Sequence, residues 1–210
     1  MTTNPELDRW NERFSSDDYL FGTAPNAFLV RQRHLLRPGA KALAIADGEG
    51  RNGVWLAEQG LDVLSVDFSP VALDKARRLA ASRGVALRTW QVNLEDWGWE
   101  AERFDVVAAV FVQFAPPDLR TAIFEGIRRT LTPGGLLLLQ GYRPEQLAYG
   151  TGGPPHAENM YTAEMLRAAF AGFEILHLEE HDSVICEGTG HDGISALVDL
   201  VARKPERKPD

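Results

Sequence analysis

Short apolar runs alternate with stretches of helical periodicity along most of the chain. The apolar runs have strand length and cover residues 41–47, 61–67, 86–92, 104–112 and 136–141. Between them, apolar residues recur every three or four positions, which predicts helices over 52–59, 71–82 and 117–131. This alternation predicts an α/β fold, in which right-handed crossovers join parallel strands into a doubly wound, Rossmann-like sheet.

The C-terminal part of the chain departs from this alternation. A helix is predicted over Thr162–Ala171, followed by strands over Phe173–Glu180 and Ile194–Arg203 with a glycine-rich loop between them. Two strands without an intervening helix favour an antiparallel hairpin at the sheet edge. We therefore expect seven strands, mostly parallel with an antiparallel C-terminal hairpin, in a single domain that spans residues 1–210.

Two segments lie outside this core. Residues 1–30 precede the first strand, and the Pro/Gly-rich residues 143–160 follow the fifth. Ligands of such sheets bind beyond the carboxyl ends of the strands. We therefore expect residues 1–30 to form a lid, with the aromatic ring of Tyr19 near a cofactor, and residues 143–160 to form a substrate-side loop.

Composition narrows the function classes. The chain carries 22 Lys and Arg against 30 Asp and Glu, a formal net charge of −8, which argues against a nucleic-acid partner. A single cysteine, Cys186, excludes an internal disulfide, and the five histidines form no metal motif, so no metal is expected. We find no apolar run of about 20 residues and no signal peptide, so no membrane association and a cytoplasmic location are expected.

The sharpest sequence feature is a glycine-rich turn directly after the first strand. Gly48, Gly50 and Gly53 have the G-x-G-x-x-G spacing of dinucleotide binders. A helix that begins at such a turn directs backbone N–H groups toward a ligand. Asp67 ends the second strand, where an acid can accept hydrogen bonds from the two hydroxyls of a ribose. Together these residues indicate an adenosine-containing cofactor.

Asp47, immediately before the glycines, discriminates between such cofactors. Its carboxylate would repel a pyrophosphate but suits a cationic ligand such as S-adenosylmethionine (SAM). A purely structural alternative is that Asp47 caps the turn.

Five segments, in order, carry a resemblance to a known family. They are IADGEGRN (45–52), LDVLSVDFSPVALDKA (61–76), VNLEDW (92–97), FDVVAAVF (104–111) and LTPGGLLLLQGY (131–142). As a set they resemble the successive motifs of class I SAM-dependent methyltransferases. The flanking segments 10–30 and 142–154 are similar to the tellurite-resistance (TehB-like) branch of that family.

The resemblance implies roles for individual residues. Asp47, Gly48 and Gly50 would hold the methionine end of SAM, and Asp67 the ribose. The other implied cofactor contacts are Phe68 and Ser69 beside the adenosine, Asn93, Leu94 and Glu95 at the adenine, Phe111, Val112 and Gln113 under the methyl group, and Glu49, Arg51, Asn52 and Tyr19. Two positions differ from many relatives: Glu49 is the middle residue of the glycine turn where relatives have cysteine, and Asn93 replaces an acid.

Methyl transfer from a sulfonium needs alignment of donor and acceptor more than it needs a base. No catalytic residue is therefore assigned. Substrate contacts are expected from the polar residues near the carboxyl edge of the sheet, Arg143, Tyr149, His156 and His191. The expected function is methyl transfer to a small molecule, such as tellurite, selenite or a thiol. The alternatives are a non-catalytic SAM-binding protein and a nicotinamide-dependent oxidoreductase.

Overall fold

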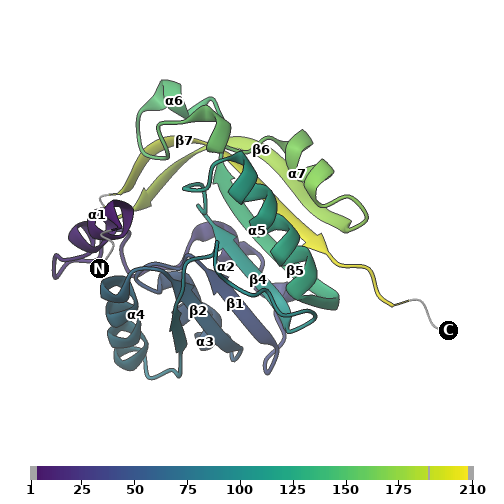
Figure 1. Ribbon diagram of the computed structural model, residues 1–210, viewed down its shortest axis with the longest axis horizontal. Helices are drawn as coiled ribbons and strands as arrows, with labels where there is room; N and C mark the ends of the chain where they lie inside the picture. The colour runs from purple at the N-terminus through teal and green to yellow at the C-terminus, as the bar shows by residue number, and fades with distance from the viewer. Residues whose placement is uncertain (1–3, 189, 208–210) are drawn as a thin grey trace.

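The chain folds around one seven-stranded sheet with strand order β3-β2-β1-β4-β5-β7-β6 (Figure 1). A computed structural model describes residues 4–188 and 190–207, with the side chain of His191 outside the described residues. The strands are β1 Lys41–Ile45, β2 Asp62–Asp67, β3 Arg88–Gln91, β4 Phe104–Val110, β5 Leu131–Tyr142, β6 Glu174–Glu187 and β7 His191–Arg203. The strands β1 to β5 pair in parallel, whereas β7 is antiparallel to both β5 and β6, so the expected fold class is confirmed.

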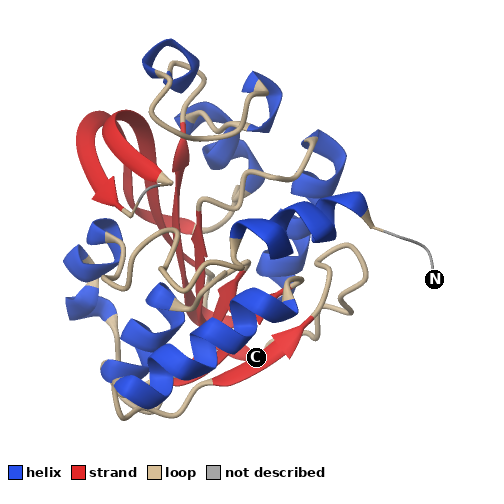
Figure 2. Cartoon of the chain, turned by 90° about the vertical axis from the view of Figure 1, so that its left-hand side faces the viewer, coloured by secondary structure: helices blue, strands red, loops and turns tan. Residues whose placement is uncertain are grey.

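Helices cover both faces of the sheet (Figure 2). They are α1 Pro5–Arg13, α2 Ala27–Arg31, α3 Arg51–Glu58, α4 Pro70–Ser82, α5 Pro117–Thr130, α6 Gln146–Tyr149 and α7 Ala163–Ala169, with single 3₁₀ turns η1 at Arg33–Leu35 and η2 at Ala157–Asn159. The helices α5 and α7 pack on one face of the sheet, and α2 and α3 pack on the other.

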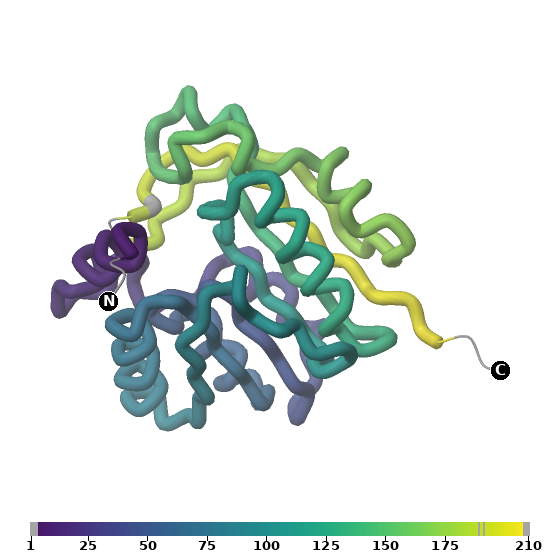
Figure 3. The backbone as a smooth tube through the Cα atoms, viewed as in Figure 1, coloured from purple at the N-terminus to yellow at the C-terminus, as the bar shows by residue number. Residues whose placement is uncertain are grey.

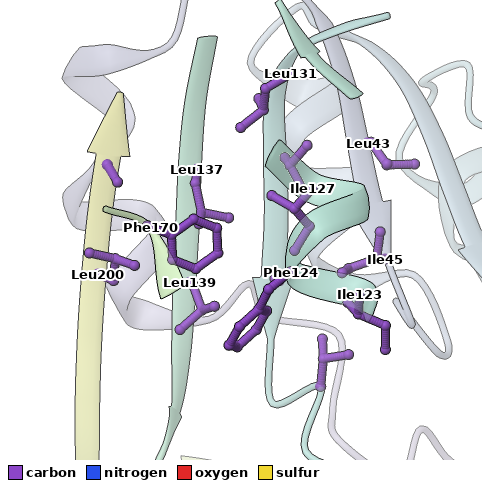
Figure 4. Close-up of a cluster of buried hydrophobic side chains, with 14 of the residues drawn as sticks. Leu43, Ile45, Ile123, Phe124, Ile127, Leu131, Leu137, Leu139, Phe170 and Leu200 are labelled. Carbon is purple, nitrogen blue, oxygen red and sulfur yellow. The ribbon is translucent and has the colours of Figure 1, made fainter. Parts of the chain in front are cut away.

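The larger core lies between α5 and the central strands. Ile123, Phe124 and Ile127 of α5 are buried, as are Leu137 and Leu139 of β5 (Figure 4). Alternate residues of each strand face opposite sides of the sheet, so neighbouring strand positions contribute to different cores. This two-sided burial explains why these strands read as continuous apolar runs.

The element boundaries differ from the sequence-based expectations at several places. The strand β4 ends at Val110 rather than residue 112, because Phe111 turns into the left-handed region with φ 55°. The hairpin strands are longer than expected, and β6 continues to Glu187. His191 is therefore the first residue of β7 rather than part of a loop, and Cys186 is an exposed residue of β6.

The N-terminal segment contains two helices and reaches the carboxyl edge of the sheet. The helix α1 begins after Asn4, whose side chain accepts hydrogen bonds from two amides of the first turn, a standard N-cap. The segment lies between α4 and the tip of the β6–β7 hairpin (Figure 3). There the amide of Gly190 donates to the carbonyl of Leu20.

Candidate functional site

The carboxyl ends of β1 and β4 meet where the strand order of the sheet reverses, the usual ligand position in such folds. Each strand ends in a non-glycine residue with positive φ, Ala46 at 46° and Phe111 at 55°. Left-handed backbone costs such residues about 1–2 kcal/mol. Strain of this kind clusters at functional sites, so both residues indicate this edge of the sheet.

Gly50 begins the helix that follows the glycine turn. It is the N-cap of α3 with φ 86°. A Cβ atom at this position would lie 2.5 Å from Cβ of Ala76 in α4. The glycine therefore permits both the left-handed turn and the close approach of the loop to α4, which leaves the amides at the start of α3 at the carboxyl edge of the sheet.

Asp67, at the end of β2, holds this loop in place. One carboxylate oxygen accepts from the amide of Gly48 at 2.9 Å and the other from the amide of Ser69 at 2.9 Å. Burial raises the pKa of Asp67 to about 6, against the opposing effect of these backbone hydrogen bonds. A carboxylate oxygen can accept more than one hydrogen bond, so Asp67 retains acceptor capacity for ligand hydroxyls.

Asp47 is oriented toward the protein interior. Its carboxylate accepts from Oγ of Ser65 at 2.7 Å and from the amide of Gly53 at 3.1 and 3.2 Å. It thereby joins β1, β2 and the first turn of α3, which is the capping role of the structural alternative. Burial raises the pKa of Asp47 to about 7, and the nearby Asp67 adds to the rise.

This raised pKa predicts that Asp47→Asn stabilises the protein at neutral pH. The folded state holds the Asp47 proton more tightly than the unfolded state does. The stability that this proton supplies is complete below pH 3.8 and is lost as the pH rises to about 7. We expect the amide variant to be more stable than wild type by roughly 1–4 kcal/mol at pH 7.5 and about equal at pH 4. Urea unfolding at both pH values measures the difference, and a variant destabilised equally at both would contradict it.

The residues expected at the adenosine lie beside the end of β2. Ser69 caps α4, and its hydroxyl donates to Oδ1 of Asn11 in the N-terminal segment at 2.6 Å. Asn93 and Glu95 bond to each other in the loop after β3, whereas the side chain of Leu94 is buried in the core. Phe68, between Asp67 and Ser69, is partly buried, and its carbonyl accepts from Nε2 of Gln91 at 3.2 Å.

Glu49 faces the N-terminal segment. Its carboxylate forms an ion pair with Lys75 of α4 at 2.5 Å and accepts from the amide of Phe21. Tyr19 lies against the same helix, where its hydroxyl donates to the carbonyl of Lys75. The structure thus brings Glu49 and Tyr19 together, and the ring of Phe14 lies 3.6 Å from where a Cβ atom at Gly48 would be.

A second wall of the site comes from the ends of β4 and β5. The rings of Phe111 and Tyr142 stack with their centroids 4.7 Å apart. The buried side chain of Gln113 donates to the carbonyl of Tyr142 at 2.8 Å and accepts from its amide at 2.6 Å. The carbonyl of Val112 accepts from the hydroxyl of Tyr161. Gln113 therefore fixes the loop after β4 against β5.

A buried polar cluster links the start of α3 to the hairpin. Arg51 pairs with Glu187 at 2.6 Å, and their side chains are 7 % and 10 % exposed. Asn26 donates to Glu187 at 3.0 Å and to Gln140 at 2.7 Å, while its amide donates to Asn52. The cluster joins residues from four separate segments at one edge of the sheet.

The expected substrate residues divide into two groups. Arg143 pairs with Asp182 at 2.5 Å, and the hydroxyl of Tyr149 donates to the same carboxylate at 2.8 Å. Because Glu145 also faces Arg143 at 3.4 Å, its charge is already compensated. His156 is exposed and lies 3.7 Å from Glu158, and the side chain of His191 lies outside the described residues. Of the described side chains, the structure brings Arg143 and Tyr149 together on the carboxylate of Asp182.

A family model described as a methyltransferase domain matches residues 42–135 of the chain, which include the glycine turn, Asp67 and Phe111. Residues 42–135, somewhat less than half of the chain, thus carry the sequence pattern of a methyltransferase domain.

The curated relatives of this chain match it over about half of its length. An uncharacterized methyltransferase of Synechocystis sp. is 33 % identical over 106 residues, which are 50 % of this chain and 48 % of that protein. The YbaJ methyltransferase of Bacillus subtilis is 30 % identical over 54 % of this chain and 44 % of its own length. A Mycobacterium tuberculosis protein is 31 % identical over 48 % of this chain and 36 % of its own. The chain thus spans half or less of the length of these relatives.

Solved structures show that the methyltransferase fold extends over nearly the whole chain. A protein studied for the conversion of a disulfide bond into a thioacetal group in echinomycin biosynthesis aligns with a TM-score of 0.75 at 22 % identity, over 97 % of this chain and 94 % of its own. TehB from Haemophilus influenzae aligns with a TM-score of 0.71 at 16 % identity, over 95 % of this chain and 67 % of its own. The N-methyltransferase NodS from Bradyrhizobium japonicum, bound to S-adenosyl-L-homocysteine, aligns with a TM-score of 0.70 at 13 % identity. The alignment covers 97 % of this chain and 100 % of NodS.

Sequence reasoning missed three residues that the methyltransferase fold brings to this edge. Asn26 follows a proline and caps α2, a signal that could have been read as the start of a helix. Lys75 and Glu187 carried no signal, because a single charge on a helix or strand reads as a solvated surface position. Within residues 4–188 and 190–207 no helix is long and apolar enough to cross a membrane, and no group of three potential metal ligands is found.

Proposed function

We propose that this methyltransferase transfers the methyl group of SAM to a small-molecule acceptor. The observation that carries the proposal is Asp67, which ends β2 with its carboxylate bonded to the amide of Gly48 in the glycine turn. The Asp67 carboxylate and the amides at the start of α3 lie beside the point where the strand order of the sheet reverses, which is the usual ligand position in such folds.

The residues present fit SAM. Nη1 of Arg51 is buried and finds no hydrogen-bond acceptor among the described residues. The guanidinium therefore retains a donor for an anionic group such as the carboxylate of the methionine moiety. Gly48, Gly50 and Asn52 form the turn beside it, and Asp67 is available to the ribose hydroxyls. Phe68 after β2, and Asn93 and Glu95 after β3, would border the adenosine.

Bound SAM supplies an electrophilic methyl group on a sulfonium, and the protein contributes alignment and exclusion of water. Phe111 and Tyr142 present stacked aromatic rings at the ends of β4 and β5, where an acceptor would enter. Gln113 keeps this wall rigid through its two bonds to Tyr142. A reactive acceptor held in line with the methyl group needs no protein base, since proximity and alignment alone can supply about 7–11 kcal/mol.

We propose a chalcogen nucleophile as the acceptor, such as a thiol, tellurite or selenite. Two structural neighbours support this choice: one belongs to a study of thioacetal formation from a disulfide, and the other is TehB, after which the tellurite-resistance branch is called TehB-like. The compensated charge of Arg143 favours a thiol over an oxyanion, because Asp182 and Glu145 already satisfy that guanidinium.

The proposal predicts micromolar binding of SAM and S-adenosyl-L-homocysteine with no binding of NADH. Isothermal titration calorimetry of the purified protein measures all three ligands. Turnover is then assayed with radiolabelled SAM and a panel of thiols, tellurite and selenite. Binding of SAM without transfer to any acceptor in the panel would favour the SAM-binding alternative, and binding of NADH alone would favour the oxidoreductase.

A further inference from the structure

An ion pair between the glycine turn and α4 is almost completely enclosed. The Nζ atom of Lys75 lies 2.5 Å from the Glu49 carboxylate, and each side chain is only 2 % exposed. Lysine and glutamate are rarely buried to this extent, and the desolvation of both charges costs several kcal/mol per ion. Such a pair is a weak source of stability, so its position suggests a different role.

The remaining contacts of Lys75 all come from the N-terminal segment. Its Nζ donates to the carbonyl of Asp18 at 2.6 Å and to that of Ser16 at 2.9 Å, and the carbonyl of Phe14 lies at 3.5 Å. The ring of Tyr19 lies 4.9 Å from the ammonium, within the range of a cation–π interaction. A single ammonium thus gathers residues 14–19 around itself.

The same segment also contacts the glycine turn directly. The amide of Phe21 donates to Glu49 at 3.4 Å, and the Phe14 ring would lie 3.6 Å from a Cβ atom at Gly48. The Tyr19 hydroxyl donates to the carbonyl of Lys75 at 3.1 Å. Lys75 and Glu49 therefore connect three parts of the molecule: the glycine turn, α4 and residues 14–21.

We propose that Lys75, acting through Glu49, is a positioning residue that holds residues 14–21 over the glycine turn and slows the release of SAM. We call this set of contacts the latch. The inference rests on the proposed function, because it takes SAM to be the ligand under the segment. Lys75 contributes through main-chain carbonyls and the Glu49 carboxylate, without touching the ligand. Other charges on α4 lack this arrangement: Asp74 pairs with Arg77 and Arg78 at 3.6 and 3.3 Å, and all three side chains are more than half exposed.

Amide hydrogen exchange of the full-length, ligand-free protein tests the latch independently of SAM. We expect Lys75→Met to accelerate exchange in residues 14–22 by tenfold or more, while exchange in β4 and β5 stays unchanged, because the segment opens locally. Tyr19→Leu, which removes the ring and the hydroxyl from the lid side, should act in the same direction. Arg77→Met, which removes an exposed charge from the same helix, should leave the segment protected.

Binding kinetics then test the positioning role. Lys75→Met is expected to weaken SAM binding about tenfold, almost entirely through faster dissociation, with an unchanged KM for the acceptor. If Lys75→Met does not fold, Tyr19→Leu decides the question by the same readouts. Unchanged exchange in residues 14–22, or faster exchange with an unchanged SAM dissociation rate, would overturn the latch. A wild-type protein that does not bind SAM would refute the proposed function. The exchange data would still test whether Lys75 holds residues 14–22 in place.

Discussion

Gly50→Ala is expected to abolish measurable SAM binding. The new Cβ atom would lie 2.5 Å from Cβ and 2.8 Å from Cα of Ala76, so the backbone of α4 or of the glycine turn must move. Positive φ adds about 1–2 kcal/mol of strain, and overpacking adds about 1–3 kcal/mol. We expect a loss of stability of about 2–4 kcal/mol by chemical denaturation and a more than hundredfold rise in the Kd for SAM by calorimetry.

A matched control separates the two causes. Gly39 has φ 82°, close to that of Gly50, but a Cβ atom there would meet nothing within 4 Å. Gly39→Ala should therefore show only the backbone strain, with SAM affinity unchanged. If both variants lose the same stability and both still bind SAM, the contact between the loop and α4 does not shape the cofactor site.

Asp67→Ala is expected to weaken SAM binding by about a hundredfold, which corresponds to about 3 kcal/mol. The change removes the carboxylate that we propose accepts from the ribose hydroxyls, and it leaves the amides of Gly48 and Ser69 without their carboxylate partner. An unsatisfied buried donor costs about 1–3 kcal/mol, so the loop that holds the ligand is also loosened. Calorimetry with SAM and with adenosine distinguishes these effects, since adenosine reports the ribose contact without the methionine end.

The same change at the other end of β2 provides the comparison. Asp62 is exposed and pairs with Arg88 at 2.8 Å, far from the glycine turn along the strand. Because exposed ion pairs contribute little, Asp62→Ala should leave SAM affinity unchanged. Loss of affinity in both variants would mean that β2 responds as a whole and that Asp67 has no particular part in binding.

The central fold could be predicted because β1, β2, β4 and most of β5 are buried on both sides, although the edge strand β3 is largely exposed. Continuous apolar runs such as that of β4, together with helices of strict 3.6-residue period such as α5, admit few other arrangements. The length of the hairpin could not be predicted in the same way. The strand β6 is a sheet edge rich in charged residues, and its outer half, from His181 to Glu187, lacks the apolar pattern of a strand. Pairing with β7, rather than local propensity, extends it.

The part of the candidate site that is formed by the glycine turn and the end of β2 could be predicted from the sequence. The glycine turn and Asp67 follow from spacing along the chain, and the structure places them side by side. Side-chain partners were not predictable, because they come from distant segments: Asp47 meets Ser65, Arg143 meets Asp182, and Lys75 meets residues 14–19. Lys75 lies on a helix next to Asp74, an exposed residue, and only the tertiary fold encloses its charge.

The contacts of Lys75 with the N-terminal segment also affect how the sequence can change. Nζ binds the carbonyl oxygens of Phe14, Ser16 and Asp18, and every amino acid has such an oxygen. The side chains of residues 15–18 are exposed, and the hydrogen bonds of Ser15 and Ser16 are local ones, to the carbonyl of Glu12 and from the amide of Asp18. This stretch can therefore accumulate substitutions while its path over the glycine turn is preserved. Descendants of one ancestor could thus diversify the outer surface of residues 15–18 without changing the main-chain contacts that hold the segment against α4.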